Sequence, residues 1–292
     1  MSIQVASHNG PFHADDVMAY ALIRSFFDTS ATIIRTRDPD RIDAAGIVID
    51  VGGIYDPERL RFDHHQSTYT GPLSAAGMVL EWLTLSGKIE EALSERLRTK
   101  LMNYVDAVDN GRVAPVEGIP CYPSLIQALN QPASTQDEFD RAFLVAHGIA
   151  AAWIAGIKAE HDRIRAAEVR IPQAMAEAVE AGRNVIFLKE YLRWKPVYFA
   201  NGGETHPTEF TLFPGTDSSW RVVAIPPKLG EFGQKRSLPK PWAGLSDEDL
   251  EAVTGVEGSV FCHKNRFIAV FKNRKAALEA LEKHGLLWRK DS

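Results

Sequence analysis

The chain has 292 residues, of which 45% are hydrophobic and 24% are charged, and its formal net charge is −5. This length favours two domains, and the composition is that of an ordinary globular protein. The acidic balance excludes binding of nucleic acid through overall positive charge, so a site for a polyanion must be local or supplied by bound metal.

The first hundred residues alternate between strand-like and helix-like segments. Buried strands are predicted at 3–7, 31–36 and 46–51. Between the first two, residues 15–27 have apolar side chains at helical spacing, and this alternation predicts an α/β domain with a parallel sheet. Two further helices are expected at 74–87 and 89–111, the second ending at Asn110 and Gly111 as helices often do.

The middle of the chain is expected to be a long helical region. A Pro- and Gly-rich passage at 114–123 interrupts the pattern, and Thr135 with Glu138 then has the form of a capping box that opens a helix running to about Gly182. Pro172 predicts a kink or a split in this helix. The most apolar segment, 142–157, is too short to span a bilayer comfortably, so we expect a buried helix and no membrane partner.

From Asn184 onward the segments are strand-like and separated by Gly, Pro and Asn turns. The predicted strand regions lie at 184–190, 196–200, 209–214, 219–226 and 259–271, and a helix over 274–284 closes the chain. The sequence thus predicts an α/β fold in three parts: an N-terminal parallel-sheet domain at 1–133, a helical connector at 134–182, and a smaller α+β domain at 183–292.

Histidines and aspartates follow several of the predicted N-terminal strands. His8 follows the first strand, with His13, Asp15 and Asp16 a few residues on; Asp50 closes the third; Asp63, His64 and His65 follow the next short apolar run. In an open parallel sheet, ligands gather at the carboxyl ends of the strands, where loops from different strands converge. A polar turn would explain one such cluster, but three in register indicate a metal site.

Two further aspartates stand in the last turn of the predicted 89–111 helix. The partial negative charge of a helix C-terminus disfavours carboxylates there, and a neighbouring cation would reverse that effect. Asp109 precedes Asn110 and Gly111 and is nearer the expected strand-end face, so we favour it as a ligand. Asp106 is expected to be a solvated surface acid.

Four motifs in order resemble those of the MYG-type branch of the DHH phosphoesterase superfamily. They are HNGPFHADDV (8–17), DVGGIYDPERLRFDHHQ (50–66), SAAG (74–77) and VDAVDNG (105–111), and the resemblance continues in SWRVVAIP, LPKPWAGL and VTGVEGSVFCHKNRFI. It therefore covers nearly the whole chain. It implies a DHH-type N-terminal domain, an active site in the cleft between this domain and the C-terminal domain, and the activity of a metal-dependent hydrolase.

The resemblance also implies a centre of two Mn²⁺-type ions. One ion would be held by His8, His13 and Asp50, and the other by Asp15, Asp50, His64 and Asp109, with Asp50 as the bridge. Asp63 would orient its neighbours, and His65 would face the scissile phosphate. The first motif departs from the usual DHH pattern, because His13 takes the place of an aspartate and stands one residue later.

The residue types support this chemistry without the family. Imidazole and carboxylate ligands without a thiolate suit Mn²⁺, with Mg²⁺, Co²⁺, Fe²⁺ or Zn²⁺ as alternatives. Two ions about 4 Å apart can lower the pKa of a bound water, which serves as the nucleophile, and clamp the phosphoryl oxygens. No covalent intermediate is needed.

Candidate contacts to substrate are found in both halves of the chain. Arg35 and Arg37 follow the second predicted strand and could hold a phosphate, although surface arginines before an Asp-Pro turn are the simpler explanation. In the C-terminal part, Arg221 and His263 belong to a set of basic residues interleaved with aromatics, as suits a single-stranded nucleic acid. DHH proteins use a Gly-Gly-Gly-His motif there; it is absent, and the segment ending at His263 is the candidate replacement.

The leading hypothesis is a two-metal phosphodiesterase, a 3′–5′ exonuclease on RNA or short oligonucleotides. The alternatives are a DHH-type hydrolase of phosphoanhydrides or small nucleotides, and a metal-stabilised binding protein without catalysis. Cys121 and Cys262 are far apart and in no metal-site spacing, and the N-terminus shows no secretory signal, so we expect a reducing, cytoplasmic environment. A homodimer is one of the oligomeric states that the sequence leaves open.

Overall fold

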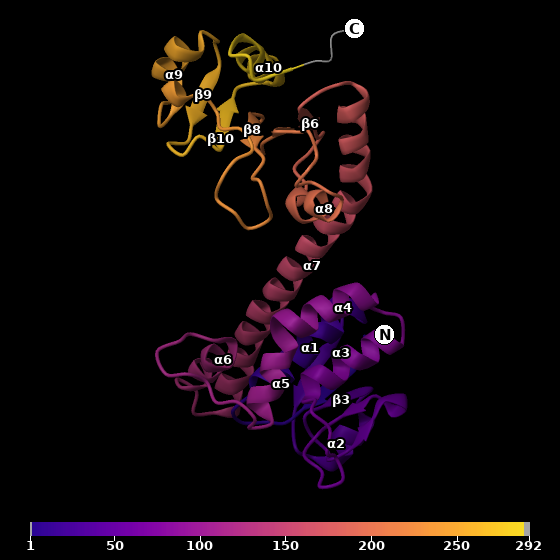
Figure 1. Ribbon diagram of the computed structural model, residues 1–292. Coiled ribbons are helices and arrows are strands. Elements are labelled where there is room, and N and C mark those ends of the chain that lie inside the picture. The colour runs from indigo at the N-terminus through magenta and orange to yellow at the C-terminus, as the bar shows by residue number, and fades with distance from the viewer. Residues whose placement is uncertain (1, 289–292) are drawn as a thin grey trace. The chain divides into compact units, whose positions relative to one another are not determined.

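The computed structural model describes residues 2–288, which form two compact units that divide between His161 and Asp162. Each unit contains one five-stranded sheet and its own hydrophobic core. Figure 1 shows the course of the chain. The predicted α/β class is confirmed. The three-part division at 133 and 182 stays a prediction.

The sheet of the first unit is mainly parallel. Its strands are β1 (Gln4–Ser7), β2 (Thr32–Arg35), β3 (Ile47–Ile49), β4 (Tyr55–Asp56) and β5 (Arg61–Phe62). They lie in the order β2-β1-β3-β5-β4, and only β4 runs antiparallel to its neighbour. Ala6 is in register with both Ile34 and Val48, so the three strands expected from the sequence end at the same edge of the sheet.

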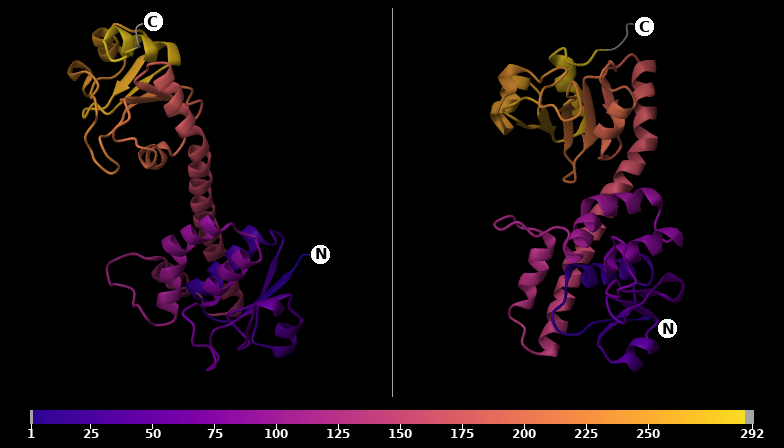
Figure 2. Two further views of the ribbon diagram at one scale, coloured as in Figure 1. Left: turned by 45° about the vertical axis from the view of Figure 1, so that its right-hand side comes forward. Right: turned by 60° about the horizontal axis from the view of Figure 1, so that its bottom comes forward.

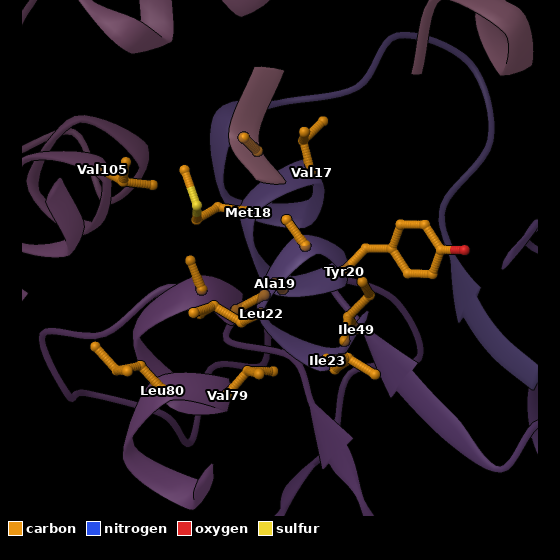
Figure 3. Close-up of a cluster of buried hydrophobic side chains, with 14 of the residues drawn as sticks. Val17, Met18, Ala19, Tyr20, Leu22, Ile23, Ile49, Val79, Leu80 and Val105 are labelled. Atoms are coloured by element: carbon orange, nitrogen blue, oxygen red, sulfur yellow. The ribbon is translucent and has the colours of Figure 1, made fainter. Parts of the chain in front are cut away.

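Helices cover both faces of this sheet. They are α1 (Ala14–Phe26), α2 (Pro39–Ala44), α3 (Ala75–Leu85), α4 (Glu91–Leu97), α5 (Asn103–Asp109), α6 (Tyr122–Asn130) and the first part of α7 (Gln136–Glu180). The main core lies between the sheet and α1 and α3, where Met18 and Leu22 pack with Val79 and Leu80 (Figure 3). On the other face, Ile42 of α2 packs with apolar side chains of β1 and β3. A π-helical turn at Arg98–Met102 joins α4 to α5, so the helix predicted at 89–111 is one helical run.

Helix α7 runs without interruption from Gln136 to Glu180 (Figure 2). Its start is the predicted capping box, because the Glu138 carboxylate accepts hydrogen bonds from the backbone N–H groups of Ser134 and Thr135. Pro172 lies inside the helix and does not split it. Proline cannot donate the usual backbone hydrogen bond of a helix. The burial of its neighbours Ile171 and Ala174 in a core cluster offsets the stability lost with that bond.

The apolar segment of α7 is only partly buried, which corrects the expectation of a wholly buried helix. Phe143, Ala146 and Ala150 pack in the core of the first unit, whereas Leu144 and Trp153 on the other side are exposed. By length and composition, α7 is the one helix in the described residues that could cross a membrane, and 28% of its apolar window is buried. Such a helix is weak evidence for a membrane span, so the absence of a membrane partner stays an expectation.

The second unit contains a mixed sheet. Its strands are β6 (Val185–Phe187), β7 (Phe210–Pro214), β8 (Trp220–Ala224), β9 (Ser259–Cys262) and β10 (Ile268–Phe271), and its helices are the end of α7, α8 (Trp194–Ala200), α9 (Asp247–Thr254) and α10 (Arg274–Lys283). The order is β6-β7-β8-β10-β9, with β6 parallel to β7 and the other pairs antiparallel. The strand predicted at 196–200 is wrong: Trp194, Val197 and Tyr198 are buried at helical spacing and form one face of α8.

Candidate metal centre

Asp50 lies at the middle of the candidate site, directly after β3. Its backbone has a φ of +53°, in the left-handed region, and its N–H donates to the carbonyl of Phe62 on β5. Aspartate tolerates this conformation better than most residues, and the sheet contact fixes it. The carboxylate is therefore held, 3% exposed, at the edge where β1, β3 and β5 end.

Three histidines surround the Asp50 carboxylate. His8 Nε2 lies 3.3 Å from one oxygen, and His64 Nε2 and His65 Nδ1 lie 3.5 and 3.4 Å from the other. Asp50 therefore faces two groups of nitrogen donors on its two sides, as a bridging ligand would. The predicted set of His8, His13 and Asp50 has ligand atoms within 4.8 Å of one another.

The second predicted set also comes together. His64 Nε2 lies 3.0 Å from Asp109 Oδ2 and 3.9 Å from Asp15 Oδ2, in addition to its contact with Asp50. Asp15 and Asp109 also form a close group with His13. Thus all six predicted ligands lie in one cluster that is built from β1, α1, β3, the loop after β5 and α5.

The buried atoms of this cluster lack partners. Both oxygens of Asp15, both oxygens of Asp50, and the Nε2 atoms of His8 and His64 have no hydrogen-bond partner among the described residues. Buried carboxylates and imidazoles without partners are costly, and they face one another here. Divalent cations would satisfy these atoms, so the residues fit a metal centre with imidazole and carboxylate ligands.

The electrostatics of the cluster also favour a cation. Burial, together with the charges of Asp50 and Asp109, raises the pKa of Asp15 well above its ordinary value. Burial lowers the pKa of His64, but the nearby carboxylates of Asp109 and Asp50 outweigh it and raise the pKa to about 10. Without metal, protons on Asp15 and His64 therefore offset part of the negative charge of the cluster, and a divalent cation would replace them.

The Asp63–His64–His65 triplet divides between the interior and the surface. Asp63 is buried; its oxygens accept from the backbone N–H of Gly53 at 2.6 Å and of His65 at 3.1 Å, and bond the His65 ring at 2.8 Å. The His64 side chain is 7% exposed and points into the cluster, whereas that of His65 is 60% exposed. This geometry matches the predicted roles: Asp63 orients its neighbours, His64 points inward as a candidate ligand, and His65 points outward.

Asp106 does not belong to the cluster and is not a surface acid, which corrects the expectation from the sequence. It is buried, and one of its oxygens accepts from the backbone N–H and hydroxyl of Ser74 and from the backbone N–H of Gly77. A side chain at Gly77 would overlap this carboxylate. The SAAG motif therefore serves to let the start of α3 approach Asp106, and Asp109 alone of the pair reaches the site.

Sequence reasoning assigned no role in the site to two residues that support the candidate ligands. Asp16 is buried behind His8; it accepts hydrogen bonds from the Ser7 hydroxyl and from the backbone N–H of His13, and so fixes the start of α1. Asn110 lies 3.2 Å from His64 Nδ1 and donates to the carbonyls of Pro72 and Asp106. The only signal for them in the sequence is that they stand next to candidate ligands. Residues that bond to metal ligands orient those ligands in most metal sites, so such neighbours are worth examining.

The two arginines after β2 have different environments. The Arg35 side chain is 2% exposed; its guanidinium pairs with Asp140 at 3.1 Å and donates to the carbonyl of Gly10 at 2.6 Å. Gly10 also donates to the side chain of Gln136, so the loop that carries His8 and His13 is tied to α7. This indicates a structural role for Arg35. Arg37 is exposed and lines a cavity of about 350 Å³ together with ligands of the cluster.

The remaining two candidates lie in the second unit. Arg221, on β8, is half-buried and lines a pocket of about 310 Å³ with Tyr191 and Gly215. His263 follows β9; its Nδ1 accepts from the backbone N–H of Asn265, and its ring packs against Phe267. Both positions are accessible, and their role in substrate binding stays a prediction.

Comparison with known proteins gives the family. The model of the MYG1 exonuclease family, described as uncharacterised protein family UPF0160, matches residues 4–284. A MYG1 protein of Chlamydia pneumoniae is 36% identical over 281 residues, which cover 95% of this chain and 94% of the relative. The MYG1 exonuclease of Homo sapiens is 30% identical over 317 residues, which cover 94% of this chain and 84% of the relative. The chain belongs to this family, and the predicted MYG-type membership is confirmed.

Among solved structures, RecJ of Thermus thermophilus in complex with Mn²⁺ aligns at a TM-score of 0.30 with 11% identity, over 97% of this chain and 52% of that one. The similarity is too low to carry an argument about the site. The family alone supports the class of protein: the prediction of a hydrolase of the nuclease type is confirmed at this level.

Proposed function

We propose that the protein is a two-metal, Mn²⁺-type phosphodiesterase that removes nucleotides one at a time from the 3′ end of RNA or of short oligonucleotides. The observation that supports it most directly is the buried cluster around Asp50, whose six unpartnered atoms face one another. Membership in a family whose mammalian relatives are named exonucleases supports the reaction class.

Each residue of the cluster has a defined task in this proposal. A pair of divalent cations, when bound, supplies a nucleophile of lowered pKa and positive charge for the phosphoryl oxygens. Asp50 would be shared between the two positions, with His8 and His13 on one side and Asp15, His64 and Asp109 on the other. Because His8, Asp15 and Asp50 are buried and held by the elements that carry them, little reorganisation of these three groups is needed on binding.

Two groups at the surface of the cluster would contact the substrate. His65 is exposed and its Nδ1 is held by Asp63 at 2.8 Å, so the other ring nitrogen, Nε2, can be directed at the scissile phosphate. Arg37 lines the same cavity as His65 and can pair with a phosphate oxygen. In the second unit, Arg221 would hold a more distant part of the strand.

The test is a Mn²⁺-supplemented assay on RNA labelled at its 5′ end, with DNA, dinucleotides and pyrophosphate in parallel. We expect the labelled RNA to shorten in steps of one nucleotide, and we expect no activity from the Asp50→Ala variant. Release of phosphate from pyrophosphate alone would contradict the proposal and favour a phosphoanhydride hydrolase. Immediate release of the 5′ label as a mononucleotide would contradict the 3′–5′ polarity.

A further inference from the structure

A large cavity of the first unit opens beside the candidate metal centre. It has a volume of about 620 Å³, and its lining includes His13 and Asp109, which are both candidate metal ligands. Its other walls come from the loop before α1, from α5 and α6, and from the start of α7. A group bound to the metals would therefore stand at the rim of this cavity.

The walls of the cavity suit an uncharged ligand. Phe12, Val105, Val108 and Phe139 contribute apolar surface, and apart from His13 and Asp109 at the rim no lining residue in the described chain carries a charge. A volume of this size lies in the usual range for small-molecule sites, which are mostly apolar with a few polar groups. Pyrophosphate would gain nothing from such walls, whereas a base and a sugar would.

Amide side chains supply the polar groups. Asn130 is already used, because it accepts from the backbone N–H of Phe12 and donates to its carbonyl, which fixes one wall. Gln127 and Gln131 also line the cavity, and among the described residues no hydrogen bond engages their side-chain amides. Amides of this kind can bond the edge of an unstacked base, and Phe139 offers a ring for stacking.

We infer that this cavity binds the base and sugar of the nucleotide that is released, while its phosphate lies at the metal centre. The inference rests on the proposed function and deepens it, because it assigns the part of the site that recognises the nucleoside and not the phosphate. The charged and uncharged parts of the nucleotide bind in different places: the cations and Arg37 hold the phosphate, and the uncharged cavity holds the nucleoside.

The experiment measures binding of AMP and of ribose 5-phosphate to the Mn²⁺-loaded protein by calorimetry, without turnover. Since stacking of one base contributes a measurable share of affinity, AMP should bind at least about 10-fold more tightly than ribose 5-phosphate. Gln127→Trp fills the cavity and should abolish this preference. Ala128→Trp is the matched control, because Ala128 is the next residue of α6, is exposed and does not line the cavity.

The Mn²⁺ affinity of both variants should equal that of the parent protein, which checks the fold. If Gln127→Trp does not fold, Gln131→Trp applies the same test from the neighbouring wall. If the cavity-filling variant and Ala128→Trp bind AMP with equal affinity, the cavity does not bind the nucleoside and the inference is overturned. This holds even if the protein degrades RNA as proposed. A preference for AMP that only cavity-filling variants lose would support it, even if the RNA assay fails and the exonuclease proposal falls.

Discussion

Aspartate has two different tasks in the first unit, and hydrogen bonds separate them. The oxygens of Asp15 and Asp50 have no partner among the described residues, as expected of ligands. Those of Asp63 and Asp106 accept bonds from backbone N–H groups and side chains, as expected of structural residues. Burial does not distinguish them, because all four are buried.

Exchange of Asp106 or Asp109 for alanine should give opposite results. Asp106→Ala leaves the donors of Ser74 and Gly77 unpaired in the interior, which should lower the free energy of unfolding by about 2 kcal/mol or more. Asp109→Ala should weaken Mn²⁺ binding and leave the metal-free protein about as stable. Urea unfolding of the metal-free proteins and Mn²⁺ titration measure both effects. A loss of metal with unchanged stability in Asp106→Ala would reverse the assignment.

His64 and His65 are neighbours in sequence but should respond differently to metal. His64→Ala removes an inward ligand, so its activity should recover in part with excess Mn²⁺, after a loss of affinity on the order of 10–100-fold or more. His65→Ala should keep its metal and remain roughly 10²–10³-fold slow at any Mn²⁺ concentration, as for other positioned donors. Asp63→Asn should fall between them, because it weakens the orientation of His65.

Activity against Mn²⁺ concentration, for the three variants side by side, is the measurement. If His64→Ala and His65→Ala show the same response, the division between ligand and phosphate contact is wrong.

At the scale of elements, the sequence predicts the helices and strands whose apolar residues recur at regular spacing. It does not predict those whose conformation depends on contacts with the rest of the fold. Strands β1, β2 and β3 and helices α1, α3 and α10 occur where apolar spacing predicts them, because their patterns are strong. Helix α8 was read as a strand from its aromatic and β-branched residues, although the spacing of its buried residues is helical. The short helices α2, α6 and α9 were missed, since few buried residues define them.

The same limit applies to the site. Clusters at strand ends, together with the family resemblance, predicted the six candidate ligands that the structure brings together, because most of them follow the end of a parallel strand, which is a local property. Their role as ligands stays a prediction. The burial of Arg35 and the capping role of Asp106 depend on contacts with residues 105 and 32 positions away. No local pattern contains such contacts.

The loop from His8 to His13 should depend on its ties to β2 and α7. Arg35→Gln removes the pair with Asp140 and the bond to the carbonyl of Gly10, so the loop should be held less firmly. We expect Mn²⁺ affinity to fall by about 10–100-fold, the size of effect that partners of ligands have. Arg37→Ala is the matched control, which should raise KM and leave Mn²⁺ affinity unchanged. If Arg35→Gln behaves like Arg37→Ala, Arg35 contacts substrate and the structural role is refuted.

At the scale of the whole molecule, the candidate site lies within the first unit. All six candidate ligands and the 620 Å³ cavity are built from residues before position 140. The second unit, with its own sheet and core, contributes no candidate ligand among the residues that the structure describes. A nuclease that acts on a strand needs contacts beyond the nucleotide at the metals, and the basic and aromatic residues of the second unit are suited to them.

Arg221→Ala should therefore lower the affinity for long RNA without changing the affinity for AMP. Arg221 lines a pocket with Tyr191, whose ring is half exposed and packs against Phe213, so a phosphate and a base can be held together. Loss of one phosphate contact should also make the affinity less sensitive to salt. The slope of log affinity against log salt concentration should become less steep by about 0.7, the value for one contact to a single strand. Arg165→Ala is the control, because Arg165 is an exposed arginine of the same unit that pairs with Glu168.

Binding of a long oligonucleotide is measured with the inactive Asp50→Ala protein at several salt concentrations, and AMP binding with the Mn²⁺-loaded active protein. Equal RNA affinities for Arg221→Ala and Arg165→Ala would show that Arg221 is ordinary surface, and the strand would then have to be held by the first unit alone.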